Sequence, residues 1–249
     1  MADVKTVSAA LVIIGNEVLS GRTKDANLAY LGENLNAVGV RLLEVRVIID
    51  DEAAIVAAVN ACRAVYDYVF TTGGIGPTHD DITTASIAAA FGVAVVRSPE
   101  AEALLRAHYK TQDVTEARLK MADVPDGAVL LDNPVSKAPG YRIGNVYVLP
   151  GVPRIMQAIF EGFRHTLAGG APMLSRTVTS RVQEGVAGQR LGELQARYPQ
   201  TEIGSYPFIR DGKSGTCLVV RCTDQAVVDE VAEEIRELVR SFGHEVMEE

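Results

Sequence analysis

The sequence has little of several residue types, and each shortage excludes a class of protein. Three cysteines in 249 residues are too few for a disulfide framework, and no CxxC pair is present to suggest a structural zinc site. Tryptophan is absent and aromatic residues make up only 6%, so the core must be built mainly from Val, Ile, Leu and Ala. Sparse cysteine suits a reducing compartment, and we expect a cytoplasmic protein.

Basic charge and long apolar runs are also scarce. The chain has 24 Lys and Arg against 32 Asp and Glu, a net charge of −8, whereas nucleic-acid binding depends on clustered basic residues. The apolar run Val7–Ile14 is far shorter than the roughly 18–20 residues of a membrane span. It is expected to be a buried strand and not a secretion signal. The predicted partners therefore include neither nucleic acid nor a membrane.

Strand-like and helix-like segments alternate along the first two-thirds of the chain. The expected strands cover residues 7–14, 45–49, 68–72, 93–96, 129–131, 141–143 and 146–149, and the expected helices cover 28–38, 55–66, 82–91, 99–109, 114–122 and 153–167. Continuous apolar strands separated by amphipathic helices are typical of a sheet covered on both faces. The pattern predicts an α/β fold with a doubly wound, mostly parallel sheet in three layers.

The order of elements changes after the Gly- and Pro-containing loop at residues 168–172. The later segments read as strand, helix, strand, strand and helix, over residues 176–182, 189–198, 202–208, 216–222 and 226–242. This βαββα order is typical of an α+β domain and not of parallel crossover units. The sequence thus predicts a larger domain over residues 1–170 and a small α+β domain over 171–249.

The segment TTGGIGPTHDDIT, residues 71–83, carries the richest chemistry. It follows a predicted buried strand and opens a predicted helix, so it belongs at the carboxyl edge of the sheet, where ligands bind. Glycines let backbone amides approach an anion, and the helix start adds free N–H groups. Asp80 and Asp81 would repel a bare phosphate, and a bridging divalent cation such as Mg²⁺ resolves the conflict. Alternatively, the aspartates only cap the helix and the glycines only form a turn.

A polar segment, GNEVLSGRTKDAN, follows the first predicted strand at the same sheet edge. It supplies the carboxylates of Glu17 and Asp25, the cations of Arg22 and Lys24, and the amide of Asn27. The alternative is that Asp25 caps the next helix and that the basic residues only face solvent.

Two rigid turns complete the set of candidate loops. NPVSKAPG, residues 133–140, contains Lys137 and Gly140, and LPGVP, residues 149–153, contains Gly151 before a predicted helix. Lys137 has the reach to contact a phosphate, and Pro150-Gly151 offers another anion-binding turn. An exposed lysine without a role is the alternative for Lys137.

Two common phosphate-binding signatures are absent. The chain has no GxxxxGK[ST] motif, which excludes a P-loop NTPase, and the glycine loop lacks the third glycine of GxGxxG, which disfavours a dinucleotide oxidoreductase. The positions of the four histidines in the sequence do not point to a Ser-His-Asp or Cys-His catalytic set.

Together the four loop segments resemble the molybdopterin-binding-like domain of the competence/damage-inducible protein A (CinA) family. The same domain type is similar to molybdenum-cofactor adenylyl- and metal-transferases and to the N-terminal half of eukaryotic FAD synthases. The resemblance covers residues 5–170. The tail from residue 176 resembles the small α+β domain that follows in longer members, where it contributes to dimer contacts. The resemblance therefore implies a homodimer or a higher homo-oligomer.

One departure from the cofactor-biosynthesis relatives concerns the glycine loop. In those relatives the loop ends in an Arg-Asp pair and a hydroxyl residue, whereas here Asp80 stands in the place of the Arg, and Asp81 and Thr83 match. The Asp-Asp loop resembles the branch of the family that is implicated in metal-dependent hydrolysis of nucleotide pyrophosphates such as ADP-ribose or FAD.

The loop residues together with this resemblance imply a divalent-metal-dependent hydrolase of nucleotide pyrophosphates. The candidate catalytic residues are Asp81, Asp80, Asp25 and Lys137, the candidate metal ligands are Asp80, Asp81 and Glu17, and the candidate substrate- and phosphate-binding residues are Gly73, Gly74, Gly76, Thr72, Thr78, Thr83, Asn27, Arg22, Gly140 and Gly151. The alternatives are a module that binds a pterin or a nucleotide without turnover, a cofactor-biosynthesis nucleotidyltransferase-like protein, and an oligomerisation scaffold.

Overall fold

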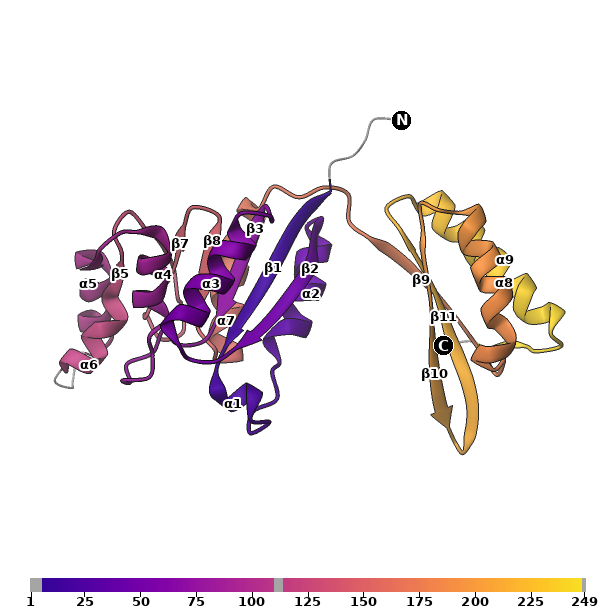
Figure 1. Cartoon of the computed structure of the whole chain (residues 1–249), viewed down its shortest axis with the longest axis horizontal. Coiled ribbons are helices and arrows are strands. Elements are labelled where there is room, and N and C mark those ends of the chain that lie inside the picture. Colours follow the sequence, from indigo (N-terminus) through magenta and orange to yellow (C-terminus); the bar gives the residue numbers. More distant parts are fainter. Residues whose placement is uncertain (1–5, 110–113, 248–249) are drawn as a thin grey trace. The chain divides into compact units, whose positions relative to one another are not determined.

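The computed structural model describes residues 6–109 and 114–247. The chain divides into two compact units, Met1–Gly170 and Ala171–Glu249, and each has its own sheet (Figure 1). None of the helices in these described ranges combines the length and the hydropathy that crossing a bilayer requires.

The first unit is built on a six-stranded sheet with the order β2-β1-β3-β8-β7-β6. Its strands are β1 (Val7–Ile14), β2 (Val40–Ile48), β3 (Tyr68–Thr72), β6 (Val129–Leu131), β7 (Gly140–Ile143) and β8 (Val146–Leu149). β1, β2, β3 and β8 run parallel, and β7 is antiparallel to both of its neighbours. The predicted doubly wound, mostly parallel sheet is confirmed.

Helices cover both faces of this sheet, because successive side chains of a strand point to opposite sides. Leu11 and Ile13 of β1 join a core with α2 (Asn27–Ala37) and α7 (Pro153–Phe163). On the other face, Val12 joins a core with α3 (Glu52–Arg63) and α4 (Thr83–Phe91). Three layers result, and apolar residues fill the space between them.

The segment between α4 and β6 departs from the predicted pattern. The strand expected at residues 93–96 is β4 (Val95–Arg97), and it pairs with β5 (Asp123–Pro125) in a separate two-stranded sheet. β5 was not predicted, since three residues that include Asp and Pro give no strand signal. The helix expected at 114–122 is a short α6 (Glu116–Leu119) followed by the 3₁₀ helix η1 (Lys120–Ala122), and η1 packs against α5 (Pro99–His108).

The second unit has an antiparallel sheet with the order β10-β11-β9-β12 and two helices packed on one face. Its elements are β9 (Leu174–Ser180), α8 (Glu184–Arg197), β10 (Glu202–Arg210), β11 (Lys213–Cys222), α9 (Gln225–Ser241) and β12 (Val246–Met247). The predicted βαββα order is confirmed. The structure adds β12 and begins α8 five residues earlier, in a glycine-containing stretch whose helix propensity is low.

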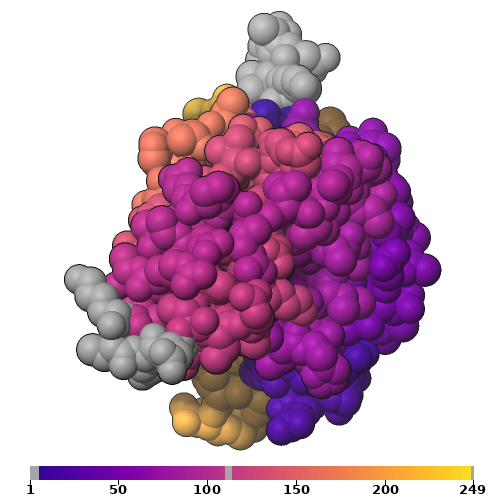
Figure 2. Space-filling view, turned by 90° about the vertical axis from the view of Figure 1, so that its left-hand side faces the viewer, coloured from indigo at the N-terminus to yellow at the C-terminus, as the bar shows by residue number. Residues whose placement is uncertain are grey.

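The directions of the strands bring four loops of the first unit to one edge. β1, β3 and β8 end at the carboxyl edge, and β7 begins there because it runs the opposite way. The loop after β1, which contains the short helix α1 (Asn16–Leu19), is the lowest part of this unit in Figure 1. Figure 2 views the unit from the side of α5 and α6, and the indigo residues of this loop lie at the lower margin.

Candidate functional site

The glycine loop after β3 depends on two residues in the left-handed region. Gly73 has φ +102° and Gly74 has φ +68°, and a Cβ on Gly73 would lie 2.1 Å from the carbonyl oxygen of Ile14. The Gly73 N–H donates to the carbonyl of Leu149 (3.1 Å), so the loop leaves the sheet between the ends of β1 and β8. Side chains are excluded here because two backbones approach each other closely.

Thr83 fastens the far end of this loop. Its hydroxyl donates to the carbonyl of Gly73 (3.0 Å) and its N–H donates to the carbonyl of Gly74 (3.0 Å). The side chain is fully buried at the first turn of α4. Thr83 thus shapes the loop through the backbone of the two glycines, and this hydroxyl already has a partner within the protein.

The carboxylates of Asp80 and Asp81 both depend on Thr78. Oδ2 of Asp81 accepts a hydrogen bond from the Thr78 N–H (2.7 Å) and one from the Thr78 hydroxyl (2.5 Å). The pKa of Asp80 is lowered from its usual value, mainly by a hydrogen bond from Thr78, then by its own backbone N–H and by the positive charges of His79 and Lys120. The Asp80 carboxylate is therefore held ionised near neutral pH.

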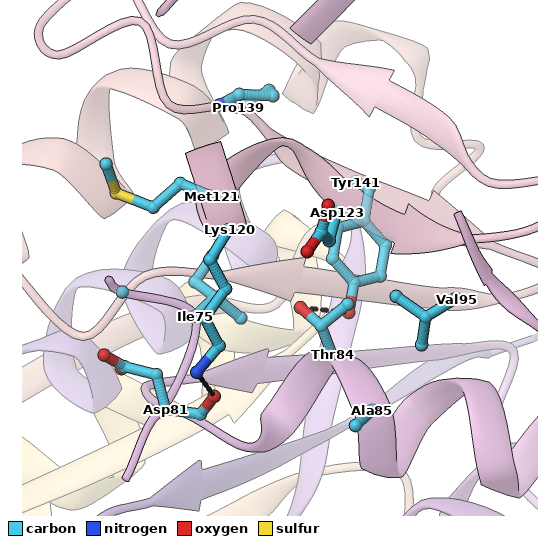
Figure 3. Close-up of a pocket in the computed structure, with 11 residues that line it drawn as sticks. Ile75, Asp81, Thr84, Ala85, Val95, Lys120, Met121, Asp123, Pro139 and Tyr141 are labelled. Atoms are coloured by element: carbon cyan, nitrogen blue, oxygen red, sulfur yellow. Dashed lines mark hydrogen bonds between the residues drawn. The ribbon is translucent and has the colours of Figure 1, made fainter. Parts of the chain in front are cut away.

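Lys120 of η1 binds the same loop from across the site (Figure 3). Its Nζ donates to the carbonyl of Thr78 (2.7 Å) and to the carbonyl of Asp81 (2.9 Å). The segment that carries η1 is itself tied down, since the Arg97 guanidinium on β4 donates to Asp123 of β5 (2.8 Å). A lysine that the sequence pattern did not single out thus fixes the part of the loop that carries both aspartates.

We expect Lys120→Met to loosen the loop without unfolding the unit. Hydrogen bonds that involve a charged group contribute about 1.5–3 kcal/mol, so amide hydrogen exchange at residues 76–82 should become about ten- to a hundredfold faster. Lys137→Met, which removes a lysine from another loop of the same edge, is the matched control and should leave exchange at 76–82 unchanged. Equal exchange rates at residues 76–82 in wild type and Lys120→Met would contradict the role of Lys120 in holding this loop.

The loop between β6 and β7 is organised by Asn133, which is 1% exposed. Its Nδ2 donates to the Ser136 hydroxyl (2.7 Å) and to the Ala138 carbonyl (2.7 Å), and its Oδ1 accepts from the N–H groups of Val135 (3.0 Å) and Ser136 (3.1 Å). One side chain therefore satisfies four polar groups of the turn. The signal in the sequence is the Asn-Pro start of NPVSKAPG, which is typical of a side-chain-stabilised turn.

The loop after β1 contributes two side-chain hydrogen bonds and one exposed carboxylate to this edge of the sheet. Asn27, at the start of α2, is 3% exposed and donates from Nδ2 to the Gly151 carbonyl (2.9 Å), which joins this loop to the one after β8. Asp25 accepts from the N–H of Leu28 (2.8 Å), the capping contact that was the alternative to a catalytic role. Glu17 lies on α1 with an exposed carboxylate.

Two adjoining cavities lie among these loops. The larger, about 520 Å³, is lined by residues of all four loops, and Glu17, the stretch from Gly73 to Pro77, Asp81 and Gly151 are among them. The smaller, about 260 Å³, is lined by Thr84, Asp123, Lys120 and Tyr141, with apolar residues between them. Asp81 belongs to the lining of both.

The smaller cavity combines an apolar wall with a few polar groups. The Tyr141 hydroxyl donates to the Thr84 hydroxyl (3.3 Å; Figure 3), and burial raises the pKa of this phenol above its usual value. Ile75, Met121 and Pro139 separate this space from the larger cavity, since they line both. Apolar walls with few fixed polar groups are typical of small-molecule sites.

The predicted residues divide according to whether they line the larger cavity. Glu17, Gly73, Gly74, Gly76, Asp81 and Gly151 line it. Within the described part of the chain, the lining of the two cavities does not include Thr72, Thr78, Thr83, Asp80, Asp25, Asn27, Arg22, Lys137 or Gly140. Several of these, namely Thr78, Thr83, Asn27 and Asp25, hold the loops by the hydrogen bonds given above. Sequence reasoning missed Lys120, Asn133, Met121 and Tyr141.

The donors around the larger cavity suit a cation that is shared with a ligand. Among residues 6–109 and 114–247, no three His, Cys, Asp or Glu side chains gather closely enough to hold a metal ion by themselves. Mg²⁺ usually takes one or two protein carboxylates together with substrate phosphates and water, and Asp81 and Glu17 offer carboxylates to one cavity. The buried hydroxyls of Thr71 and Thr72, at the end of β3, have no hydrogen-bond partner among the residues that the structure describes. The residues present therefore fit a hard cation that arrives with a phosphate ligand.

Comparison with known families divides the chain at the same place as the fold. Residues 10–169 match the family model described as "Probable molybdopterin binding domain", and residues 172–243 match the model described as "FAD synthase, middle domain". The solved structure of the protein CinA from Thermoplasma acidophilum is similar, with a TM-score of 0.61 and 34% identity, and it aligns over 65% of this chain and 99% of that one.

Among curated proteins, the chain is similar to one from Pyrobaculum calidifontis, at 39% identity over 80% of each chain. A CinA-like protein of Desulfosudis oleivorans is 34% identical over 79% of this chain and 51% of that protein. A "Probable FAD synthase" of Caenorhabditis briggsae is 30% identical over 95% of this chain and 50% of that protein. The chain thus spans about half the length of the CinA-like and FAD synthase relatives.

Proposed function

The chain belongs to the molybdopterin-binding-domain family that CinA-like proteins and FAD synthases share, and from this premise we propose that it hydrolyses nucleotide pyrophosphates of the ADP-ribose or FAD type with a divalent cation. The observation that carries the proposal is the larger cavity, in which a glycine loop and two carboxylates face one space. The backbone of the glycine loop suits a phosphate, and the two carboxylates suit a cation beside that phosphate.

The anion-binding half of the proposal rests on the backbone of the glycine loop. Gly73, Gly74 and Gly76 line the cavity, and α4 begins at Thr83 directly after the loop. Because the Gly73 and Thr83 N–H groups already donate to backbone carbonyls, the phosphate is assigned to the N–H groups of Gly74 and Gly76. N–H groups at a helix start, together with the positive end of the helix dipole, stabilise a bound phosphate without a charged side chain. We assign the diphosphate of the substrate to this loop.

The cation half rests on Asp81 and Glu17. Their carboxylates would repel the diphosphate unless a divalent cation lay between them, and Mg²⁺ binds such oxygen ligands. When bound, the cation would polarise the phosphoryl oxygens and lower the pKa of an attacking water. Asp81 is the stronger ligand candidate, because Thr78 holds its carboxylate in one position while leaving Oδ1 available in the hydrogen bonds that the structure gives.

The test is to incubate the full chain with ADP-ribose or FAD, with and without Mg²⁺, and to measure release of AMP together with ribose 5-phosphate or FMN. Asp81→Asn keeps an oxygen that can accept from the Thr78 N–H but removes the negative charge, and it should lower the metal-dependent rate at least about a hundredfold. Asp132→Asn, which removes an exposed carboxylate outside both cavities, is the control. A rate that Asp81→Asn leaves unchanged, or one that is independent of the cation, would end this assignment.

A second candidate is a module that binds a pterin or nucleotide and does not turn it over. It is favoured by one observation: the basic residues predicted to neutralise the leaving phosphate, Arg22 and Lys137, are absent from the lining of the two cavities. Stoichiometric binding of a nucleotide or pterin in calorimetry, with no product after long incubation, would select this function over hydrolysis.

A further inference from the structure

β2 is an edge strand with an unusual exposed stripe. In the sheet order it lies at one end and pairs with β1 alone among the strands that the structure describes. Alternate side chains from Leu43 to Ile49 are exposed: Leu43 54%, Val45 37%, Val47 40% and Ile49 49%. Edge strands of stable monomers are usually short or carry charges on both faces, because open backbone groups and apolar side chains promote pairing.

The charges of β2 lie between these apolar residues. The Arg46 Nε donates to Oε1 of Glu44 (2.6 Å), and the Tyr66 hydroxyl donates to Oε2 of the same carboxylate (2.7 Å). Both charged side chains stay about one-third exposed, so each can contact a further group. These hydrogen bonds lower the pKa of Glu44, which keeps it ionised near neutral pH.

We infer that β2 pairs antiparallel with β2 of a second copy of this chain. The twofold axis lies between the two strands, midway between Val45 and its counterpart, and each register below is named by the residue that faces its own counterpart. Charge decides among the possible registers. An axis through Glu44 would place two glutamates opposite each other, and an axis through Arg46 would do the same for two arginines. Only the axis through Val45 places Glu44 opposite Arg46 of the partner subunit, twice in one interface.

The same register also brings the apolar stripes of the two copies side by side. A twofold axis perpendicular to the sheet keeps both copies of the stripe on one face, so Val45 meets its own counterpart and Leu43 faces Val47 of the partner subunit. The register shift between β1 and β2 falls between Ala9 and Ala10, beside Leu43, and leaves residues 44–48 regular. Pairing would join two six-stranded sheets and remove both open edges. This inference does not depend on the proposed hydrolase activity.

The first measurement is the mass of the full chain in solution by light scattering or sedimentation. Wild type should have twice the chain mass of 26.7 kDa. Glu44→Arg and Arg46→Glu should each weaken the dimer at least about tenfold, because like charges then face each other, and the double variant should restore it. A monomeric wild type, or a double variant that dissociates as the single variants do, would overturn the inference.

The second measurement uses cysteine cross-linking to test the register. Val45→Cys should form a disulfide with its counterpart under mild oxidation, since directly opposite Cβ atoms lie about 4.5–5.5 Å apart. Val47→Cys should not, because its counterpart lies four residues along the strand, about 13 Å away. The wild type, with Cys62 and Cys222 buried and Cys217 half-buried, gives the baseline. A dimer that Val45→Cys does not cross-link would place the contact elsewhere, for example in the second unit, and would reject this interface.

Discussion

Gly73→Ala is expected to destabilise the first unit by about 3–5 kcal/mol and to abolish ligand binding at the larger cavity. A left-handed backbone costs a residue with a side chain about 1–3 kcal/mol, and the new Cβ would also lie 2.1 Å from the carbonyl oxygen of Ile14. The only relief is to move the loop away from β1, and this movement displaces the N–H groups that we assign to the phosphate. Urea unfolding of the full chain, followed by circular dichroism, measures the loss of stability.

Gly92→Ala is the matched control for this prediction. Gly92 has φ +67° at the end of α4, but a Cβ there would meet no atom of the described residues within 4 Å. It carries the conformational cost alone, about 1–2 kcal/mol, and should leave ligand binding intact. If the two alanine variants lost equal stability, the close approach of Gly73 to the end of β1 would not be the cause.

Asn133→Ala is the second change with a large expected effect, about 2–4 kcal/mol. The buried amide makes four hydrogen bonds, each with a net contribution of about 0.5–1.5 kcal/mol, and its loss leaves the turn without its internal support. Because Asn133, Ser136 and Ala138 all line the larger cavity, ligand affinity should fall as well. Thermal unfolding with and without an added nucleotide diphosphate and Mg²⁺ measures both effects.

The neighbouring Asp132→Ala provides the control for Asn133→Ala. The Asp132 side chain is 70% exposed and lies 4.0 Å from Lys137 Nζ, so its removal should change the free energy of unfolding by less than about 0.5 kcal/mol. A small effect of Asn133→Ala, comparable to that of Asp132→Ala, would mean that water replaces the amide in holding this turn.

The glycine loop gave a clearer signal in the sequence than the turn that Asn133 holds. The two adjacent glycines of the loop after β3 pointed to a special backbone, and the structure gives both of them positive φ. Asn133 was part of a quoted motif, yet nothing in the motif indicated that its side chain would be buried with four partners. Lys120 gave no signal at all, since its contacts with Thr78 and Asp81 join residues about 40 positions apart.

The sequence by itself determined the fold class and the sheet edge that carries the site. Apolar runs such as Val7–Ile14 are long enough for buried strands, and the glycine loop directly follows one of them, so its position at the carboxyl edge follows from chain direction alone. The family followed from the same four loops, because their motifs and the order of these motifs can be read directly from the sequence.

Only the tertiary structure decided which polar residues share a cavity and which hold the loops. Asp25 and Thr83 are residue types that could bind a ligand, but in the structure each makes a hydrogen bond to the backbone of its own loop. The spacing of residues in the sequence does not distinguish these two roles. Asp81 and Glu17 meet at one cavity because two parallel strands end side by side. Sequence patterns record the neighbours of a residue along the chain, whereas the site depends on neighbours across the sheet, and these are fixed only when the strands pair.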